Sequence, residues 1–123
     1  MPRGPRLDAL GSLHPIMVRG IERKKIFESE RDIQGRLVGK GDFEAQARQV
    51  YTNLKNILKE AGGDLKNIVK TTPILTHYGH IESYRKIRNE FFGNIMPPNT
   101  LLIIESLASP DFMIEVEGIA VLD

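Results

Sequence analysis

Two glutamates near the end of the chain are the residues whose types and spacing most clearly suggest chemistry. Glu115 and Glu117 are separated by one residue within the stretch 112–122, and residues two apart in an extended strand lie on the same face. A carboxylate in a cleft can act as a general base that activates water. Two carboxylates on an exposed strand face can equally well form ion pairs, and the spacing leaves both interpretations open.

Two other motifs carry less information. His77-x-x-His80 supplies two histidines, but no cysteine and no suitably placed carboxylate completes a metal site, so a surface loop is favoured and no metal is expected. The run from Gly35 to Gly41 has the glycines of a phosphate-binding loop. Its interval between glycines is one residue too short, and no Ser or Thr follows Lys40, so we reject that interpretation.

The composition limits the classes of protein. The chain has 123 residues, of which 41% are hydrophobic and 27% charged, which fits one compact domain. The absence of cysteine excludes disulfides and thiol nucleophiles. No apolar run approaches the ~18 residues of a membrane span, and no secretory signal is visible at the N-terminus. We therefore expect no membrane association and a cytoplasmic protein.

The charge distribution bears on possible partners. The net charge is +1, which gives no strong field for nucleic acid or anionic lipid. Residues 1–25 carry six Lys or Arg side chains and two acidic ones, and a solvated basic tail is favoured over a phosphate-binding segment. The tyrosines that could stack on bases are not interleaved with basic clusters, so nucleic acid is not the expected partner.

The elements that must position these residues follow from hydrophobic periodicity. Residues 1–13 read as a loosely ordered lead-in, and residues 14–123 as a single domain. Strands are predicted over 15–18, 25–29, 65–76, 100–106 and 112–122, and helices over 43–61 and 81–92. Asp42 is the expected N-cap of the first helix and Gly62-Gly63 its stop. This β-β-α-β-α-β-β order predicts an α+β fold with two helices on one face of a sheet.

The other face of that sheet poses a problem for a monomer. Residues 101–104 read Leu-Leu-Ile-Ile, so this strand is apolar on both faces. An uncovered sheet face of this kind would expose a large apolar patch. The sequence therefore favours a homo-oligomer that buries sheet against sheet, with clefts where the subunits meet.

Three stretches carry a resemblance to a known family. They are GRLVGKGDFEAQARQVYTNLKNILKEAGGDLKNIVKTT (35–72), NEFFG (89–93) and MIEVEGIAVL (113–122). They resemble the Rid family, also called YjgF, and the resemblance covers about residues 14–122. It implies a chorismate-mutase-like α+β subunit and a barrel-shaped homotrimer with ligand clefts between subunits. The best-known members hydrolyse reactive imines and enamines to ketones and ammonia without a metal or organic cofactor.

The resemblance also assigns roles to residues. It makes Glu115 the glutamate that activates the catalytic water, and it makes Ser29 the serine that orients this water or the developing amine. Ile16 stands where the family has the tyrosine of a Gly-Pro-Tyr motif. Glu30 replaces a glycine after that serine, which would favour a cationic or neutral substrate over an acidic one.

The strongest departure concerns the substrate anchor. The family's Pro-Ala-Arg-Ser is Pro-Pro-Asn-Thr here, so Asn99 replaces the arginine that binds a substrate carboxylate in the family. An amide lacks the positive charge of a guanidinium and cannot donate its two parallel hydrogen bonds. Leu101 replaces a frequent cysteine. Arg85 stands where the second helix usually offers an asparagine, and with Arg88 on the same helical face it is either a relocated cation or part of a solvated surface. Two functions follow: a hydrolase with a shifted substrate, or a metabolite-binding or regulatory trimer without catalysis.

Overall fold

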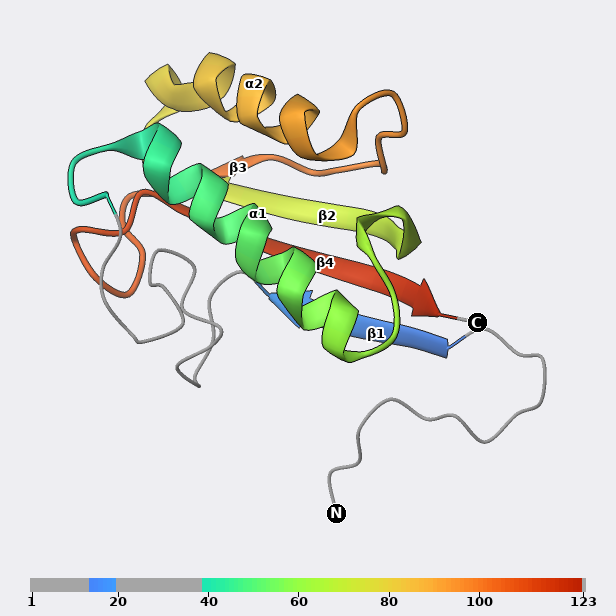
Figure 1. Ribbon diagram of the computed structural model, residues 1–123. Coiled ribbons are helices and arrows are strands. Elements are labelled where there is room, and N and C mark those ends of the chain that lie inside the picture. The colour runs from blue at the N-terminus through green and yellow to red at the C-terminus, as the bar shows by residue number, and fades with distance from the viewer. Residues whose placement is uncertain (1–13, 20–38, 123) are drawn as a thin grey trace.

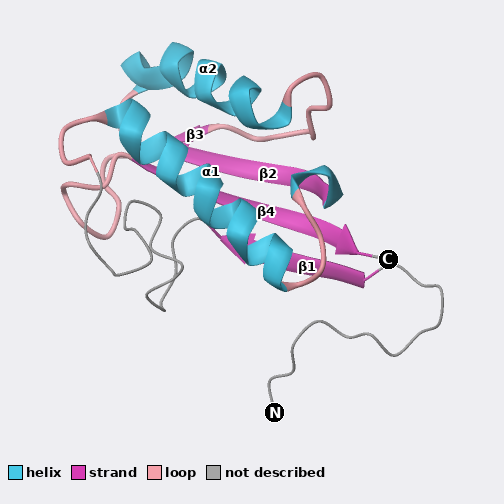
Figure 2. Ribbon diagram, viewed as in Figure 1, coloured by secondary structure: helices cyan, strands magenta, loops and turns pink. Residues whose placement is uncertain are grey.

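The computed structural model describes residues 14–19 and 39–122. They form a four-stranded sheet with the strand order β1-β4-β2-β3, and both helices lie on one face of it (Figures 1 and 2). The strands are β1 (His14–Arg19), β2 (Ile68–Leu75), β3 (Leu102–Ile103) and β4 (Ile114–Leu122), and the helices are α1 (Phe43–Glu60) and α2 (Ile81–Phe92). The α+β architecture with two helices on one face is thus confirmed.

Helix α1 begins and ends as its sequence predicts. The Asp42 side chain accepts a hydrogen bond from the Ala45 N–H at 3.1 Å, which satisfies one of the free donors of the first turn. After the C-cap Ala61, Gly62 adopts a φ of +88°, a conformation that glycine adopts without strain. Between these ends, the apolar stripe packs against the sheet with its main side chains fully buried: Ala47, Val50, Tyr51, Leu54 and Leu58.

Helix α2 connects two parallel strands. It buries Tyr84 and Ile87 and ends before Gly93, whose φ is +63°. Strand β2 precedes it and β3 follows it, and these two strands pair in parallel, as expected for a strand-helix-strand crossover. The helices run in the same direction, because Glu44 of α1 pairs with Lys86 of α2 and, one turn further along, Arg48 pairs with Glu90.

Strand β4 is central and separates two chemically different faces. Ile114, Val116 and Ala120 are fully buried under the helices, and the alternation of a strand turns Glu115 and Glu117 to the other side. We call that other side, away from α1 and α2, the open face. Strand β2 keeps the same alternation after an irregularity of register between Ile68 and Lys70.

The predicted strand over 100–106 is wrong in its extent. Strand β3 contains two residues, Leu102 and Ile103, preceded by an isolated bridge between Asn99 and Thr71. It pairs with the last two residues of β2, and residues 104–106 are not part of a strand. Similarly, residues 65–67 form a 3-10 turn (η2, Leu65–Asn67) before β2 begins. The expected lead-in 1–13 and the expected strand 25–29 lie outside the described residues.

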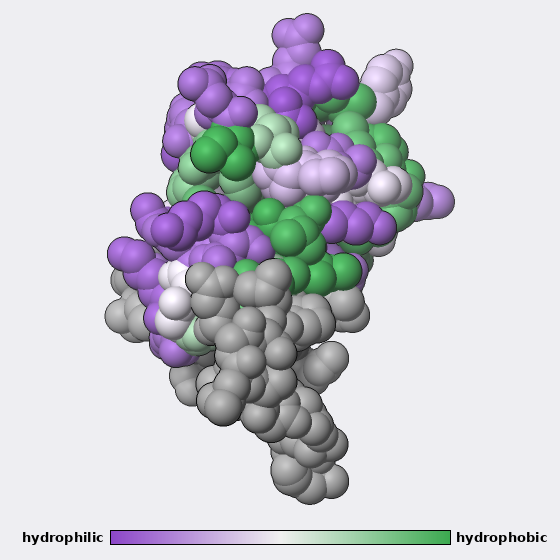
Figure 3. All heavy atoms as spheres, turned by 90° about the vertical axis from the view of Figure 1, so that its right-hand side faces the viewer, coloured by the Kyte–Doolittle hydropathy of each residue, from purple (hydrophilic) through white to green (hydrophobic). Residues whose placement is uncertain are grey.

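Apolar side chains remain exposed around the edge formed by β2 and β3. The exposed fractions are 48% for Val69, 43% for Leu102, 42% for Ile103 and 36% for Ile104. Figure 3 shows hydrophobic (green) atoms that reach the surface in several patches, with hydrophilic (purple) atoms between them. An apolar area of this kind is typical of a surface that another chain covers.

Candidate functional site

Glu115 is the most unusual polar residue of the sheet. Its side chain is 6% exposed, so it does not lie on an exposed strand surface, and burial of a carboxylate is costly unless the group is paired or hydrogen-bonded. Across the sheet it stands opposite Ile74 of β2, which in turn stands opposite Leu102 of β3. The carboxylate therefore lies on the open face beside Ile74, in a part of the sheet that is shielded from water.

Asn99 is held at a different point of the sheet edge. The Thr71 N–H donates to the Pro98 carbonyl at 3.0 Å, and the Thr100 N–H donates to the Thr71 carbonyl at 3.1 Å. These bonds fix Asn99 beside Thr71, with its side chain exposed. Asn99 is offset from Glu115 by three residues along the strands and by two strand spacings across the sheet. The two Cα atoms are therefore about 14 Å apart. One subunit does not bring this amide to that carboxylate.

The two arginines of α2 belong to the helix layer. Arg85 is exposed, and the Arg88 guanidinium carbon lies 5.4 Å from the centre of the Tyr84 ring, in cation–π range. Since α2 covers the face of the sheet opposite to the open face, neither arginine approaches Glu115 within one subunit. Arg85 remains available to solvent, and Arg88 is engaged with an aromatic side chain.

The remaining residues that the sequence singled out are scattered. Leu101 is half-buried and packs against the core. The backbone register pairs Ile16 with Ala120 of β4. Ser29 and Glu30 lie outside the described residues.

The two histidines act as structural groups in the described part of the chain. The His77 Nδ1 atom accepts a hydrogen bond from the Gly79 N–H at 2.9 Å, and the His80 ring stacks on Phe43 at 4.4 Å between ring centres. Burial, with a smaller contribution from His77, lowers the pKa of His80 below its usual value. Within residues 14–19 and 39–122, no three His, Asp or Glu side chains gather as a metal site would need.

A buried tyrosine pair lies between the two helices, and the sequence analysis assigned it no role. Tyr51 of α1 and Tyr84 of α2 are 0% and 1% exposed, yet neither hydroxyl has a hydrogen-bond partner within residues 14–19 and 39–122. Burial raises the pKa of Tyr51 well above its usual value, with the nearby Tyr84 as a second cause, and burial also raises the pKa of Tyr84. The hydroxyls thus influence each other's ionisation without making a hydrogen bond of good geometry.

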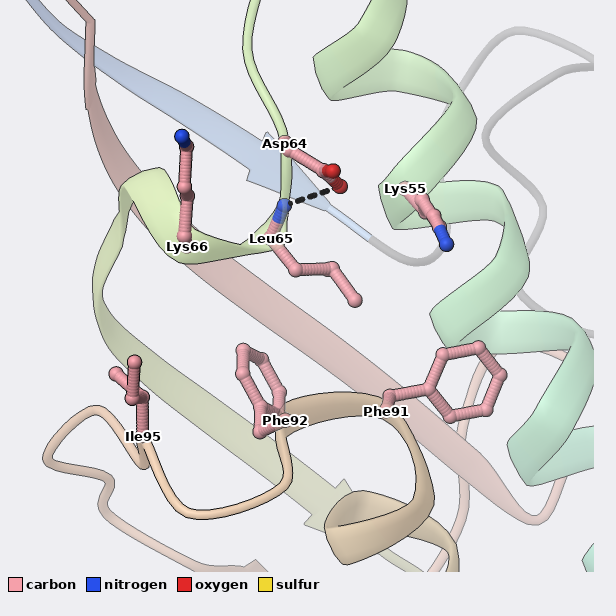
Figure 4. Close-up of a pocket in the computed structure, with 7 residues that line it drawn as sticks. All are labelled: Lys55, Asp64, Leu65, Lys66, Phe91, Phe92 and Ile95. Carbon is pink, nitrogen blue, oxygen red and sulfur yellow. Dashed lines mark hydrogen bonds between the residues drawn. The ribbon is translucent and has the colours of Figure 1, made fainter.

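A pocket near the ends of both helices was not predicted either. Its volume is about 220 Å³, and Figure 4 shows side chains from α1, η2, α2 and the following loop around it. The lining residues are Lys55, Asp64, Leu65, Lys66, Phe91, Phe92 and Ile95. The adjacent phenylalanines and the lysines were visible in the sequence, but their convergence depends on how α1 and α2 pack.

The finding for membranes concerns the described residues alone. Neither α1 nor α2 combines the length and the apolar character that crossing a bilayer requires.

Comparisons with known proteins agree with this fold. The family model described as Endoribonuclease L-PSP matches residues 29–122. A RutC family protein of Synechocystis is 33% identical over 86 residues, which cover 70% of this chain and 66% of that protein. The human protein named 2-iminobutanoate/2-iminopropanoate deaminase is 32% identical over 87 residues, which cover 71% of this chain and 62% of the human one. The matched stretch is thus under two thirds of the length of either relative.

A solved structure gives the same assignment. A protein of unknown function from Yersinia pestis, YyfB, of the conserved Rid protein family, superposes with a TM-score of 0.70 at 28% identity, covering 76% of this chain and 73% of that one. The sheet with two helices on one face defines the class, a YjgF-type α+β subunit. The chain belongs to the Rid family.

Proposed function

We propose that this protein is a divergent, cofactor-free Rid-family hydrolase that acts on a small imine, enamine or related nitrogenous metabolite in a cleft between subunits of a homotrimer. The observation that carries this proposal is the burial of Glu115 on the open face of the sheet. The human relative whose printed name is an imino-acid deaminase supports the reaction class.

The chemistry needs one base and one water molecule. Glu115 removes a proton from water as the water oxygen adds to the carbon of the C=N bond. Glu115 passes this proton to the nitrogen, which gives a carbinolamine. The hydroxyl proton of the carbinolamine then moves to the nitrogen by way of Glu115, and the C–N bond breaks to give a ketone and ammonia. One imine and one water are consumed, so no oxidant or reductant is required. Ser29 orients the water or the developing amine in this scheme.

The location between subunits follows from what one subunit lacks. The Cα atoms of Asn99 and Glu115 are about 14 Å apart within a chain, so the amide of Asn99 does not contact the carboxylate of Glu115. The exposed apolar side chains of Val69, Leu102 and Ile103 mark the neighbouring edge as a contact surface. A second copy placed there would close the open face and supply the missing wall of the cleft.

The substrate is expected to differ from a 2-imino acid. An arginine binds a carboxylate through two parallel charged hydrogen bonds, whereas Asn99 offers an uncharged amide. Arg85, which is exposed on α2, is the candidate for a replacement cation from a neighbouring subunit, with Arg88 one turn away. Ile16, Leu101 and Glu30 complete the proposed substrate-binding set. Within it, the Glu30 carboxylate favours a neutral or cationic ligand, whereas Arg85 would favour an anionic group.

Ammonia release from enzymatically generated imines tests the proposal. Glu115→Gln is expected to reduce turnover about 10²–10⁴-fold, the usual effect of losing a general base. Glu82→Gln is the matched control, because Glu82 is an exposed glutamate of α2. Unchanged turnover in folded Glu115→Gln, or no turnover of any imine by the trimeric wild type, would refute the proposal.

A paired substitution tests why the substrate changed. Glu30→Gly combined with Asn99→Arg is expected to restore hydrolysis of 2-imino acids, because it removes a repelling carboxylate and adds the charged fork. A trimeric double variant that stays inactive would contradict this explanation of the divergence.

A second candidate is a metabolite-binding or regulatory trimer that has lost catalysis. The observation that favours it is the replacement of the charged anchor by Asn99. Metabolites would then stabilise the protein by about 2.7 kcal/mol at a hundredfold excess over the dissociation constant, without turnover. Binding of single-stranded RNA that weakens steeply with salt would instead indicate a nucleic-acid partner, contrary to our expectation.

A further inference from the structure

The pocket near the ends of α1 and α2 is separate from the proposed catalytic cleft. It lies on the helix side of the sheet, beside η2 and the start of β2. Glu115 is on the opposite face and stands opposite Ile74, six residues or about 20 Å along β2 from Ile68. A molecule in this pocket therefore would not contact Glu115 of the same subunit.

One wall of the pocket is aromatic and held rigidly. The Phe91 ring lies 5.4 Å from the Tyr51 ring, and the Phe92 ring meets the same tyrosine edge-to-face at 5.8 Å. Tyr51 is 0% exposed, so it anchors both phenyl rings from behind. Ile95, which is 72% exposed, extends this wall from the loop after α2 (Figure 4). A preorganised apolar wall lowers the ordering cost of binding.

The polar groups of the pocket are predominantly cationic. Lys55 comes from α1 and Lys66 from η2, and neither ammonium group forms an ion pair among the described residues. The one carboxylate, Asp64, is committed to the backbone, because its Oδ1 accepts from the Leu65 N–H at 2.7 Å and its side chain caps η2. Two lysines against one aspartate leave a net charge of +1 around the pocket.

We propose that this pocket is a second small-molecule site, which binds a compact anion with a planar apolar body, such as an aromatic monocarboxylate. The apolar body lies against Phe91, Phe92 and Ile95, and the anionic group faces Lys55. Lys66, which points away from the phenyl rings (Figure 4), adds positive charge at the rim. A volume of about 220 Å³ is smaller than the ~300–1,000 Å³ of sites for drug-sized ligands, so it suits a molecule of one ring.

Ligand-observed fluorine NMR with 4-fluorobenzoate tests this site in the intact protein. We expect binding with a dissociation constant in the millimolar range, weakened at least tenfold in the double variant Lys55→Gln/Lys66→Gln. Lys59→Gln is the matched control, because Lys59 is an exposed lysine of α1 outside the pocket. The isosteric cation 4-fluorobenzylamine is expected not to bind.

Two further variants separate this site from the proposed cleft and from nonspecific attraction. Ile95→Ser, at an exposed loop position, is expected to weaken 4-fluorobenzoate binding, whereas Glu115→Gln is expected to leave it unchanged. Equal binding of the amine and the carboxylate, no effect of the lysine substitutions, or no binding at millimolar concentration would overturn the proposal. Loss of binding in Glu115→Gln would place the ligand in the catalytic cleft instead.

Discussion

Removal of the Tyr51 hydroxyl is expected to stabilise the fold. The hydroxyl lies at the contact between α1 and α2 with no hydrogen-bond partner, and the Tyr51 side chain is 0% exposed. Tyr51→Phe keeps the ring and its contacts with Phe91 and Phe92 at 5.4 and 5.8 Å. The substitution therefore removes a desolvated polar group and leaves the aromatic packing in place.

The size of the effect follows from the cost of an unsatisfied buried group. Leaving a neutral donor or acceptor unpaired costs about 1–3 kcal/mol. The void left by one oxygen atom, together with the proximity of the Tyr84 hydroxyl, offsets part of that gain. We expect a net increase of about 1 kcal/mol in the free energy of unfolding, which corresponds to about 3–5 °C in the midpoint of thermal unfolding for a domain of this size.

Urea-induced unfolding at one fixed protein concentration measures this change, because the stability of an oligomer depends on concentration. Tyr78→Phe is the control and is expected to be neutral, since Tyr78 is 72% exposed. A loss of 1 kcal/mol or more in Tyr51→Phe would show that the hydroxyl has a partner, such as an ordered water, and would refute the reasoning.

The same pair gives a pH dependence with a definite sign. Burial raises the pKa of Tyr51 well above 10.0 and raises that of Tyr84 as well. In the unfolded chain both phenols lose their protons near pH 10, so the unfolded state binds fewer protons there and gains stability. The free energy of unfolding is expected to fall above about pH 10, and less steeply in Tyr51→Phe. An unchanged slope in that variant would contradict the assignment.

Three other predictions concern stability. A Cβ at Gly63 would lie 2.4 Å from the Leu122 side chain, so Gly63→Ala is expected to lower the urea midpoint, and a neutral result would show that the C-terminal strand yields easily. Burial, and secondarily His77, lowers the pKa of His80 in the folded protein below 6.5. The contribution of His80 to the free energy of unfolding is therefore fully present above pH 6.5 and is lost as the pH falls through the pKa of the folded state. A weaker loss is expected in His80→Phe. Arg48→Ala breaks the exposed ion pair with Glu90 at 2.8 Å. It is expected to lower the urea midpoint slightly, and this loss should be smaller in about 1 M salt, because salt weakens exposed ion pairs.

Local signals in the sequence predicted the helices well. The apolar stripe of α1, the Asp42 cap and the glycine stop act over a few residues, and each is found where the pattern placed it. The ends of strands depend on partners distant in sequence. Leu102 and Ile103 form a strand only because Ile74 and Leu75 of β2 pair with them. The length of this strand therefore cannot be predicted from its own residues.

The sheet face that carries Glu115 was predictable from the sequence, but the environment of this side chain was not. The spacing of Glu115 and Glu117 put both on one face, and alternation with buried residues of β4 confirms that placement. The 6% exposure of Glu115 depends on surrounding segments and could not be derived from a period of two. The aromatic pocket was missed for a related reason. Phe92 lies off the main apolar stripe of α2, and it lines the same pocket as Lys55 only because the two helices pack together.

The pairing of the first strand with the last has a consequence for how the chain reaches its native state. His14 stands opposite Leu122 and Arg19 opposite Glu117, so the two extremities of the domain lie next to each other in space. During synthesis β1 therefore stays unpaired until β4 has also been made. The same adjacency suits circular permutation of the domain, in which a short linker would join residues 14 and 122 and new ends would open in an exposed turn.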